Sequence, residues 1–206
     1  MIAQALAAAG REVVVVEAAE TFGTVTSSRN SEVVHAGLYY PTGSLKARFC
    51  RRGRDLLYAW LREHGVEHLR CEKLVVATDE AEVSQLHGVA ARAEANGVED
   101  LRWLTGAEAR AMEPEVRCIA ALHSPSTGIF DSHGYMLSLK GAAESFGAMF
   151  AFHAQVVGGA VRDDGILLRL ADSGLSQDEP RDAGGSMELL CHIVVNSAGL
   201  GAQGVS

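Results

Sequence analysis

The first seventeen residues place an alanine-rich run, a glycine, four valines and a glutamate in that order. Residues 1–9 predict a helix whose small side chains allow close packing against a sheet, and Gly10 is expected to end it. Residues 13–16 form an all-apolar run, which is typical of a parallel strand buried on both faces. A helix followed by such a strand resembles the second half of a dinucleotide-binding unit and favours an α/β fold.

Glu17 closes this predicted strand. In dinucleotide-binding folds, an acidic residue at that position binds the ribose hydroxyls, about 20 residues after the first glycine of G-x-G-x-x-G. Counting back from Glu17 by that interval passes Met1. We therefore expect the first strand and the glycine turn to precede Met1. The alternative is that Glu17 is only a surface residue at the end of a strand.

A second glycine pattern lies near the other end of the chain. Residues 199–204 read G-L-G-A-Q-G and follow an apolar run, 192–196, that predicts a strand. A strand before G-x-G-x-x-G is the arrangement that brings backbone N–H groups to a pyrophosphate. One hypothesis is therefore an NAD-type site here. The other is a strand-to-loop exit at which Ala198 and Gly199 let a nucleotide pass close to the backbone.

Composition excludes several classes of protein. With 206 residues the chain is long enough for a sizeable core, and its formal net charge of -8 argues against non-specific nucleic-acid binding. The four cysteines form no C-x-x-C pair, so we expect reduced thiols in a cytoplasmic protein and no metal site. No window approaches the roughly 20 apolar residues that span a bilayer.

The middle of the chain alternates predicted helices and strands, and after residue 147 the pattern becomes one of strands. The order indicates one α/β domain interrupted by a smaller one. We expect residues 1–64 and 132–206 to form a discontinuous α/β domain and 65–131 to form an inserted α+β part. The polar segment 171–186 is expected to be a solvated hairpin connection. The predicted elements are helices at 44–64, 81–97 and 132–146, a short helix with a capping box at Thr105 and Glu108, and strands at 69–78, 101–104, 118–124 and 128–131.

The segment between residues 26 and 41 lacks an apolar period. It gathers hydroxyls, an amide, a guanidinium, an imidazole and two tyrosines within 16 residues. Long irregular segments inside compact domains tend to carry function. We therefore expect this segment to line a site.

The same segment carries a resemblance to a known family. The run TSSRNSEVVHAGLYYPTGSLKARFC is followed in order by CEKLVVAT, EANGVEDLRWL, HSPSTGIFDSH and VVNSAGLGA. Together these runs resemble the L-2-hydroxyglutarate dehydrogenase/oxidase branch of the D-amino acid oxidase-like flavoproteins. The resemblance extends from residue 1 to about residue 204, and it implies that a further C-terminal half follows Ser206.

The resemblance implies an incomplete FAD-binding, Rossmann-like domain with an inserted substrate domain. Glu17 would bind the adenosine ribose of FAD, and the backbone of Val156 would meet the adenine. The late glycine pattern would be a coincidence of spacing. The other residues implied to bind FAD are Thr26, Ser27, Ser28, Arg29 and Asn30, along the pyrophosphate and flavin, with Ala198 and Gly199 at the late turn.

The resemblance also implies oxidation of a 2-hydroxy acid, most specifically L-2-hydroxyglutarate, by hydride transfer to flavin N5. His35 is the expected base for the hydroxyl proton, because a neutral imidazole titrates near pH 7. The alternative is that His35 only orients the flavin. Arg29 is the expected partner of a substrate carboxylate, and Tyr39 and Tyr40 are expected to close over the substrate. Oxygen or a quinone would accept the electrons.

Two alternatives remain from the sequence. One is an inactive remnant of such a flavoprotein that binds no flavin. The other is a related amine or amino acid oxidase of the same superfamily.

Overall fold

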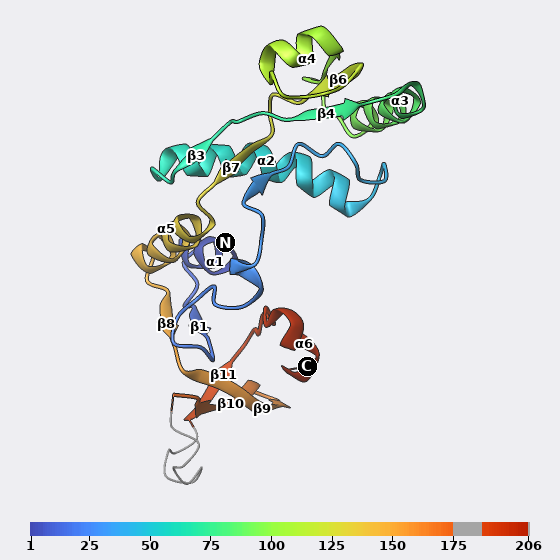
Figure 1. Ribbon diagram of the computed structural model, residues 1–206. Coiled ribbons are helices and arrows are strands. Elements are labelled where there is room, and N and C mark those ends of the chain that lie inside the picture. The colour runs from blue at the N-terminus through green and yellow to red at the C-terminus, as the bar shows by residue number, and fades with distance from the viewer. Residues whose placement is uncertain (175–186, 206) are drawn as a thin grey trace. The chain divides into compact units, whose positions relative to one another are not determined.

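The computed structural model describes residues 1–174 and 187–205 (Figure 1). The chain divides into two compact units. Unit 1 comprises Met1–Asn30 and Met136–Ser206, and unit 2 comprises Ser31–Tyr135. Most of the segment predicted to be a hairpin connection, 171–186, lies outside the described residues.

Unit 2 begins earlier in the chain than the predicted insert. Residues 31–64 were expected to belong to the discontinuous α/β domain, yet they lie in unit 2. The reason is packing: Tyr58 and Leu61 are fully buried in a cluster with Val34 and Val66. The helix that carries them therefore belongs to the core of unit 2.

Unit 2 consists of two small antiparallel sheets and the helices packed on them. One sheet has the order β2-β7-β3 and the other β4-β6-β5. The elements are β2 (Val33–Val34), α2 (Leu45–Glu63), β3 (His68–Leu69), β4 (Leu74–Ala77), α3 (Glu80–Ala95), β5 (Arg102–Thr105), α4 (Gly106–Met112), β6 (Ala120–His123) and β7 (Gly128–Phe130).

Local chemistry explains where these helices begin. The Ser44 hydroxyl accepts a hydrogen bond from the backbone N–H of Ala47, as an N-cap does. Thr105 and Glu108 form the predicted capping box in front of α4. Hydrogen bonds from the backbone N–H and hydroxyl of Thr105 lower the pKa of the Glu108 carboxyl. Each of these predicted helix starts is confirmed.

The predicted strand 69–78 is two strands instead. Between β3 and β4 the backbone of Glu72 adopts a φ of 63°, which an extended strand does not allow. The Glu72 N–H donates to the Thr127 carbonyl over 2.9 Å, and its carboxylate lies 2.7 Å from His123 Nε2. The bend transfers the chain from one sheet of unit 2 to the other.

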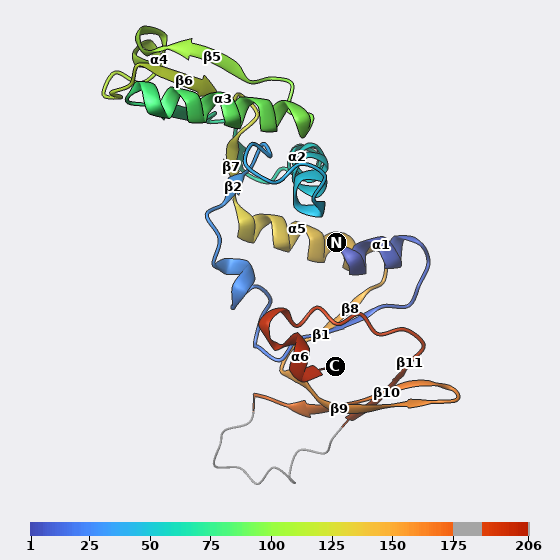
Figure 2. The same ribbon diagram turned by 90° about the vertical axis from the view of Figure 1, so that its right-hand side faces the viewer.

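Unit 1 contains a two-stranded parallel sheet and a three-stranded antiparallel one. Strand β1 pairs in parallel with β8, and the second sheet has the order β11-β10-β9 (Figure 2). The elements are α1 (Ile2–Ala8), β1 (Val14–Val16), the 3-10 turn η1 (Thr26–Ser28), α5 (Ser132–Ser145, which begins in unit 2), β8 (Met149–Ala151), β9 (Ala154–Arg162), β10 (Gly165–Asp172), β11 (Met187–Cys191), η2 (Gly199–Gly201) and α6 (Ala202–Val205).

The alanine-rich start of the chain packs as predicted. Ala7 of α1 is buried against Ala143 of α5 and Ala148, beside the strand residues Val13 and Phe150. Small side chains allow this close approach. After α1, Gly10 adopts a φ of 76°, and its N–H donates to the Ala7 carbonyl, so the glycine ends the helix as expected.

The prediction of a strand at 192–196 is wrong. The described backbone after β11 is irregular up to residue 198. A strand needs a neighbour for its backbone hydrogen bonds, and no described strand pairs with this segment. Its apolar side chains are consequently exposed, by 71% at Ile193 and 49% at Val195. A nucleotide-binding G-x-G-x-x-G motif follows a strand, and among the described residues no strand lies directly before G-L-G-A-Q-G.

Candidate functional site

The H-A-G-L-Y-Y segment of unit 2 is extended, and its side chains alternate. Ala36 and Leu38 are buried in a cluster with Ala93 and Val98. His35 is therefore turned to the other side, toward solvent. Burial of alternate residues fixes which side chains this segment presents.

Side chains from two helices hold the segment in place. The Asn96 side-chain N–H₂, at the end of α3, donates to the carbonyls of Gly37 (3.3 Å) and Tyr40 (2.9 Å). In α2, the Cys50 thiol donates to the His35 carbonyl over 3.4 Å. Gly37 has a φ of 100°, a conformation that strains a residue with a side chain. The segment is thus anchored at its start, middle and end.

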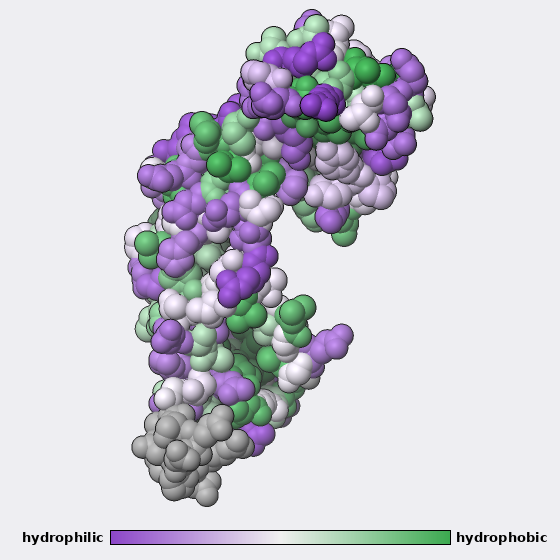
Figure 3. Space-filling view, viewed as in Figure 1, coloured by the Kyte–Doolittle hydropathy of each residue, from purple (hydrophilic) through white to green (hydrophobic). Residues whose placement is uncertain are grey.

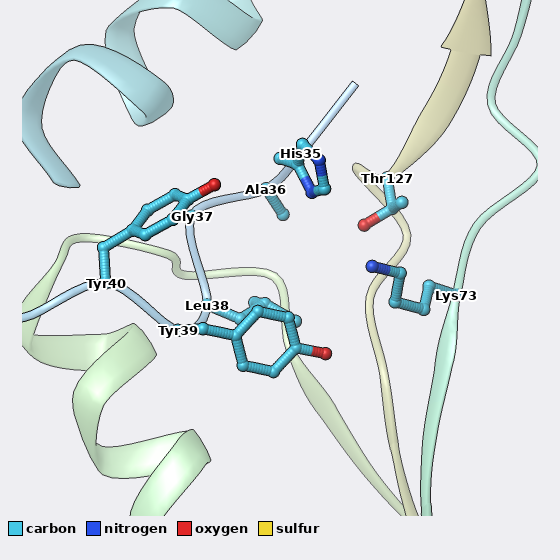
Figure 4. Close-up of a pocket in the computed structure, with 8 residues that line it drawn as sticks. All are labelled: His35, Ala36, Gly37, Leu38, Tyr39, Tyr40, Lys73 and Thr127. Carbon is cyan, nitrogen blue, oxygen red and sulfur yellow. The ribbon is translucent and has the colours of Figure 1, made fainter. Parts of the chain in front are cut away.

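A small hollow lies beside this segment (Figure 4). Residues 35–40 form one wall, and Lys73 and Thr127 close it from the far side. The hollow therefore combines an imidazole, two phenols, an ammonium and a hydroxyl. His35, Tyr39 and Tyr40 are the predicted residues that meet here.

Lys73 is the residue that the sequence did not single out. It lies next to Ser124 because the two backbones exchange hydrogen bonds: Lys73 N–H to the Ser124 carbonyl over 3.1 Å, and Ser124 N–H to the Lys73 carbonyl over 2.8 Å. The same turn places Thr127 in the hollow. Lys73 lies in the run CEKLVVAT, but the sequence alone does not bring it to His35; this long-range pairing does.

Two lysines, Lys73 in the hollow and Lys46 nearby, place positive charge close to His35. The pKa of His35 is lowered, first by partial removal of water from its ring and then by the charges of Lys73 and Lys46. His35 is nevertheless exposed to solvent by more than a third of its surface. Because its pKa is lowered, the imidazole is neutral at neutral pH.

The two tyrosines stand beside the two lysines. Lys46 Nζ lies 4.7 Å from the centroid of the Tyr40 ring, and Lys73 Nζ lies 5.7 Å from that of Tyr39. Both separations are within the range of cation–π attraction. Burial raises the pKa of each phenol. The tyrosines are therefore neutral hydrogen-bond donors at neutral pH.

A second, open hollow lies in unit 1. Thr24, Val25, Thr26, Arg29 and Leu200 line it. Figure 3 shows hydrophobic side chains around α6 and β9–β11 in the lower part of the view, and Leu200 is 90% exposed. The hollow is thus part apolar and part polar, as ligand sites usually are.

The structure brings together two segments that the sequence separates by more than 150 residues. A Cβ built on Gly199 would meet only the Thr26 hydroxyl, at 3.9 Å. Gly199 has a φ of 58°, so it makes the sharp exit that precedes η2. The Asn196 side chain holds this exit by donating to the Ala202 carbonyl (2.8 Å) and accepting from the Ala198 N–H (3.2 Å).

The polar loop beside Gly199 is ordered by its own side chains. The Ser28 hydroxyl donates to the Val25 carbonyl, and the Asn30 side chain donates to the Ser27 carbonyl over 2.8 Å. Arg29 Nη1 lies 3.4 Å from Ser28 Oγ, and its guanidinium is exposed. The predicted residues 26–30 therefore form one turn on unit 1.

Glu17 directly follows β1, as predicted, and Val156 lies within β9. The Glu17 N–H donates to the Ala151 carbonyl at the end of the parallel pair, and one carboxylate oxygen accepts from the Ala19 N–H over 2.9 Å. Within the described part of the chain, the other carboxylate oxygen of this half-buried residue accepts no hydrogen bond. Val156 lies on β9 opposite Leu170, at an irregularity in the pairing with β10.

Comparison with known proteins identifies the family. The family described as FAD dependent oxidoreductase matches residues 1–206. The chain belongs to this family. Among the residues that the structure describes, no helix is long and apolar enough to cross a membrane, and no group of three or more His, Cys, Asp or Glu side chains is placed to hold a metal ion.

Relatives in other organisms carry the name L-2-hydroxyglutarate dehydrogenase. The chain is 44% identical, over 223 aligned residues, to the mitochondrial L-2-hydroxyglutarate dehydrogenase of Arabidopsis thaliana, covering 100% of this chain and 46% of that protein. It is 31% identical to the mouse mitochondrial enzyme of the same name, covering 96% of this chain and 42% of the mouse protein. The chain thus spans less than half the length of these relatives. The cytoplasmic location predicted from the sequence stays a prediction.

Solved structures share the fold. L-proline dehydrogenase from P. horikoshii superposes with a TM-score of 0.79 at 21% identity, covering 99% of this chain and 50% of that one. Glycine oxidase from Geobacillus kaustophilus gives 0.70 at 24% identity, covering 82% and 47%. These likenesses establish a mixed α/β fold of the kind these oxidoreductases have.

Proposed function

We propose that the chain carries FAD-binding and substrate-binding parts of an oxidoreductase that oxidises L-2-hydroxyglutarate. The observation that carries the proposal is the 44% identity to the Arabidopsis enzyme across the whole chain. That span includes both hollows. Their chemistry supports the proposal, because one offers hydroxyl and guanidinium donors and the other offers cations and an imidazole.

The residues of unit 1 fit part of an FAD site. The space beside Gly199 is open up to the Thr26 hydroxyl, so an extended ligand would approach the backbone there. The available carboxylate oxygen of Glu17 suits ribose hydroxyls, and the exposed Arg29 guanidinium suits a pyrophosphate. Residues 26–30, Ala198 and Gly199 would hold the cofactor, and the backbone of Val156 would contact the adenine.

When bound, the flavin would supply the hydride acceptor at N5. The chain's own task is to orient the 2-hydroxy acid and to take the hydroxyl proton. His35 Nε2 or Nδ1 would accept that proton, because the ring is neutral at neutral pH and exposed in the hollow. The phenols of Tyr39 and Tyr40 would donate hydrogen bonds to substrate oxygens.

Two roles are proposed for Arg29: binding a cofactor phosphate and binding a substrate carboxylate. It lines the hollow of unit 1 rather than that of unit 2. Its position therefore favours binding of a cofactor phosphate over binding of a substrate carboxylate. The sequence suggested both roles. An Arg29→Lys variant separates the two: weaker FAD affinity supports the first role, and a raised KM for L-2-hydroxyglutarate at saturating FAD supports the second.

Reconstitution tests the proposal. The purified protein is titrated with FAD and assayed for conversion of L-2-hydroxyglutarate to 2-oxoglutarate, with oxygen or a soluble quinone as acceptor. Saturable FAD binding that Glu17→Gln weakens, together with turnover of the L-enantiomer, is the expected result. Absence of FAD binding would favour an inactive remnant, and turnover of an amino acid instead would favour a related amine oxidase.

A further inference from the structure

We propose that Lys73 binds a carboxylate of the substrate in the hollow of unit 2. This inference rests on the proposed function and adds to it the cation that a dicarboxylate requires there. A five-carbon diacid carries two negative charges at neutral pH, and a buried or half-buried anion needs a cationic or hydrogen-bonding partner. Figure 4 shows the Lys73 ammonium directed toward His35 and Thr127.

The backbone of Lys73 is fixed, which positions its side chain. The paired hydrogen bonds with Ser124 hold the residue at the start of β4. The preceding residue, Glu72, turns its carboxylate to His123 instead. The residue is half-buried, and its ammonium lies over the Tyr39 ring, which limits the directions the side chain takes. A lysine held in this way is partly preorganised for a ligand.

The Lys73 ammonium can donate hydrogen bonds to a ligand. Among residues 1–174 and 187–205, no carboxylate forms an ion pair with Lys73. An ammonium has three N–H donors, and the cation–π contact with Tyr39 uses none of them as a conventional hydrogen bond. Lys73 is also close enough to His35 for its charge to lower the pKa of the imidazole, after the larger effect of partial burial.

Thr127 supplies a second donor. Its side chain is buried, and its hydroxyl lies 3.0 Å from the Ser124 hydroxyl. When Ser124 donates to Thr127, the Thr127 hydroxyl is left to donate into the hollow. An ammonium and a hydroxyl on one wall would bind the two oxygens of one carboxylate. The hollow is small and open to solvent, so only one end of a ligand would be held there.

The test uses glutarate, a dicarboxylate that cannot be oxidised at a hydroxyl, and glutaramide as its neutral counterpart. Binding to the purified protein is followed by calorimetry and by NMR shifts of His35 and Thr127. Wild type is expected to bind glutarate and not glutaramide. Lys73→Met is expected to weaken glutarate binding at least about tenfold, the effect of one charge-assisted contact. Lys73→Arg should retain most of the affinity.

Lys140→Met is the matched control. It removes the same charge, and Lys140 pairs with Glu144 and does not line the hollow. Equal glutarate affinity in Lys73→Met and Lys140→Met, or no glutarate binding by wild type, would overturn the inference. Because glutarate binding requires no flavin, Lys73-dependent binding in a protein that fails to oxidise L-2-hydroxyglutarate would reject the proposed function and leave the inference standing.

Discussion

The side-chain amide of Asn96, at the end of α3, donates a hydrogen bond to the backbone carbonyl of Tyr40 over 2.9 Å. The same amide reaches the Gly37 carbonyl at 3.3 Å. One helix end thus holds the middle and the end of the segment that carries His35. The shape of the hollow depends on this contact between residues 56 positions apart in the sequence.

Asn96→Ala removes both hydrogen bonds and leaves two carbonyls without this donor. We expect a loss of about 1–2 kcal/mol in the free energy of unfolding, measured with urea. Asn96→Asp should cost more, since it replaces the donor with a negative oxygen facing two carbonyls. An Asp variant as stable as wild type would contradict the role assigned to this amide.

Substitution by alanine is expected to have opposite effects on stability at Gly128 and at Gly88. A Cβ on Gly128 would collide with the Tyr58 hydroxyl and the Leu69 carbonyl, whereas a Cβ on Gly88, within α3, meets nothing within 4 Å. We expect Gly128→Ala to destabilise unit 2 by about 1–3 kcal/mol. Gly88→Ala should stabilise it by about 0.5–1 kcal/mol. Thermal unfolding of the two variants side by side measures the contrast, and the same sign for both would refute the packing described.

The pH dependence of His35 follows from its surroundings. Its folded pKa is below the unfolded value of about 6.5. The unfolded chain therefore binds more protons in that window, so this group makes stability rise as pH rises through the folded pKa toward 6.5. NMR titration of the ring protons gives the pKa directly.

Variants assign the cause of the His35 shift. Lys73→Met should raise the His35 pKa, Lys46→Met should raise it less, and Lys140→Met should leave it unchanged, because Lys73 precedes Lys46 among the charges that lower it. An unchanged His35 pKa in Lys73→Met would show that the two side chains do not share the hollow.

Features that depend on neighbouring residues were predictable from the sequence. The Ser44 cap, the Thr105–Glu108 capping box and the glycine stop at Gly10 each follow from residues within a few positions, and the structure confirms them. Periodic or all-apolar runs likewise located most helices and strands. Local chemistry is sufficient for these features because the partners are adjacent in sequence.

Features that depend on distant partners were not predictable in this way. The apolar run 192–196 reads as a strand, but no described strand pairs with it. Lys73 lies in the run CEKLVVAT, yet its place in the hollow depends on its pairing with Ser124, 51 positions later in the sequence. The extent of unit 2 also depends on distant contacts, since α2 packs through Tyr58 against Val34 and lies in that unit.

The role of His35 as a base is tested by His35→Asn, which keeps a polar side chain of similar size but cannot accept a proton at neutral pH. We expect flavin reduction by substrate to slow by about 10²–10⁴-fold, the usual contribution of a general base. The affinity for glutarate should change little. Unchanged reduction in this variant would assign proton transfer to another group.

Anaerobic mixing with L-2-hydroxyglutarate tests the central claim most directly. The FAD-reconstituted protein is mixed with either enantiomer while the visible absorbance of the flavin is followed in a stopped-flow instrument. The account predicts bleaching of the oxidised flavin by the L-enantiomer, with 2-oxoglutarate formed in equal amount, and slow or no bleaching by the D-enantiomer. Flavin that binds but stays oxidised with the L-enantiomer would contradict it.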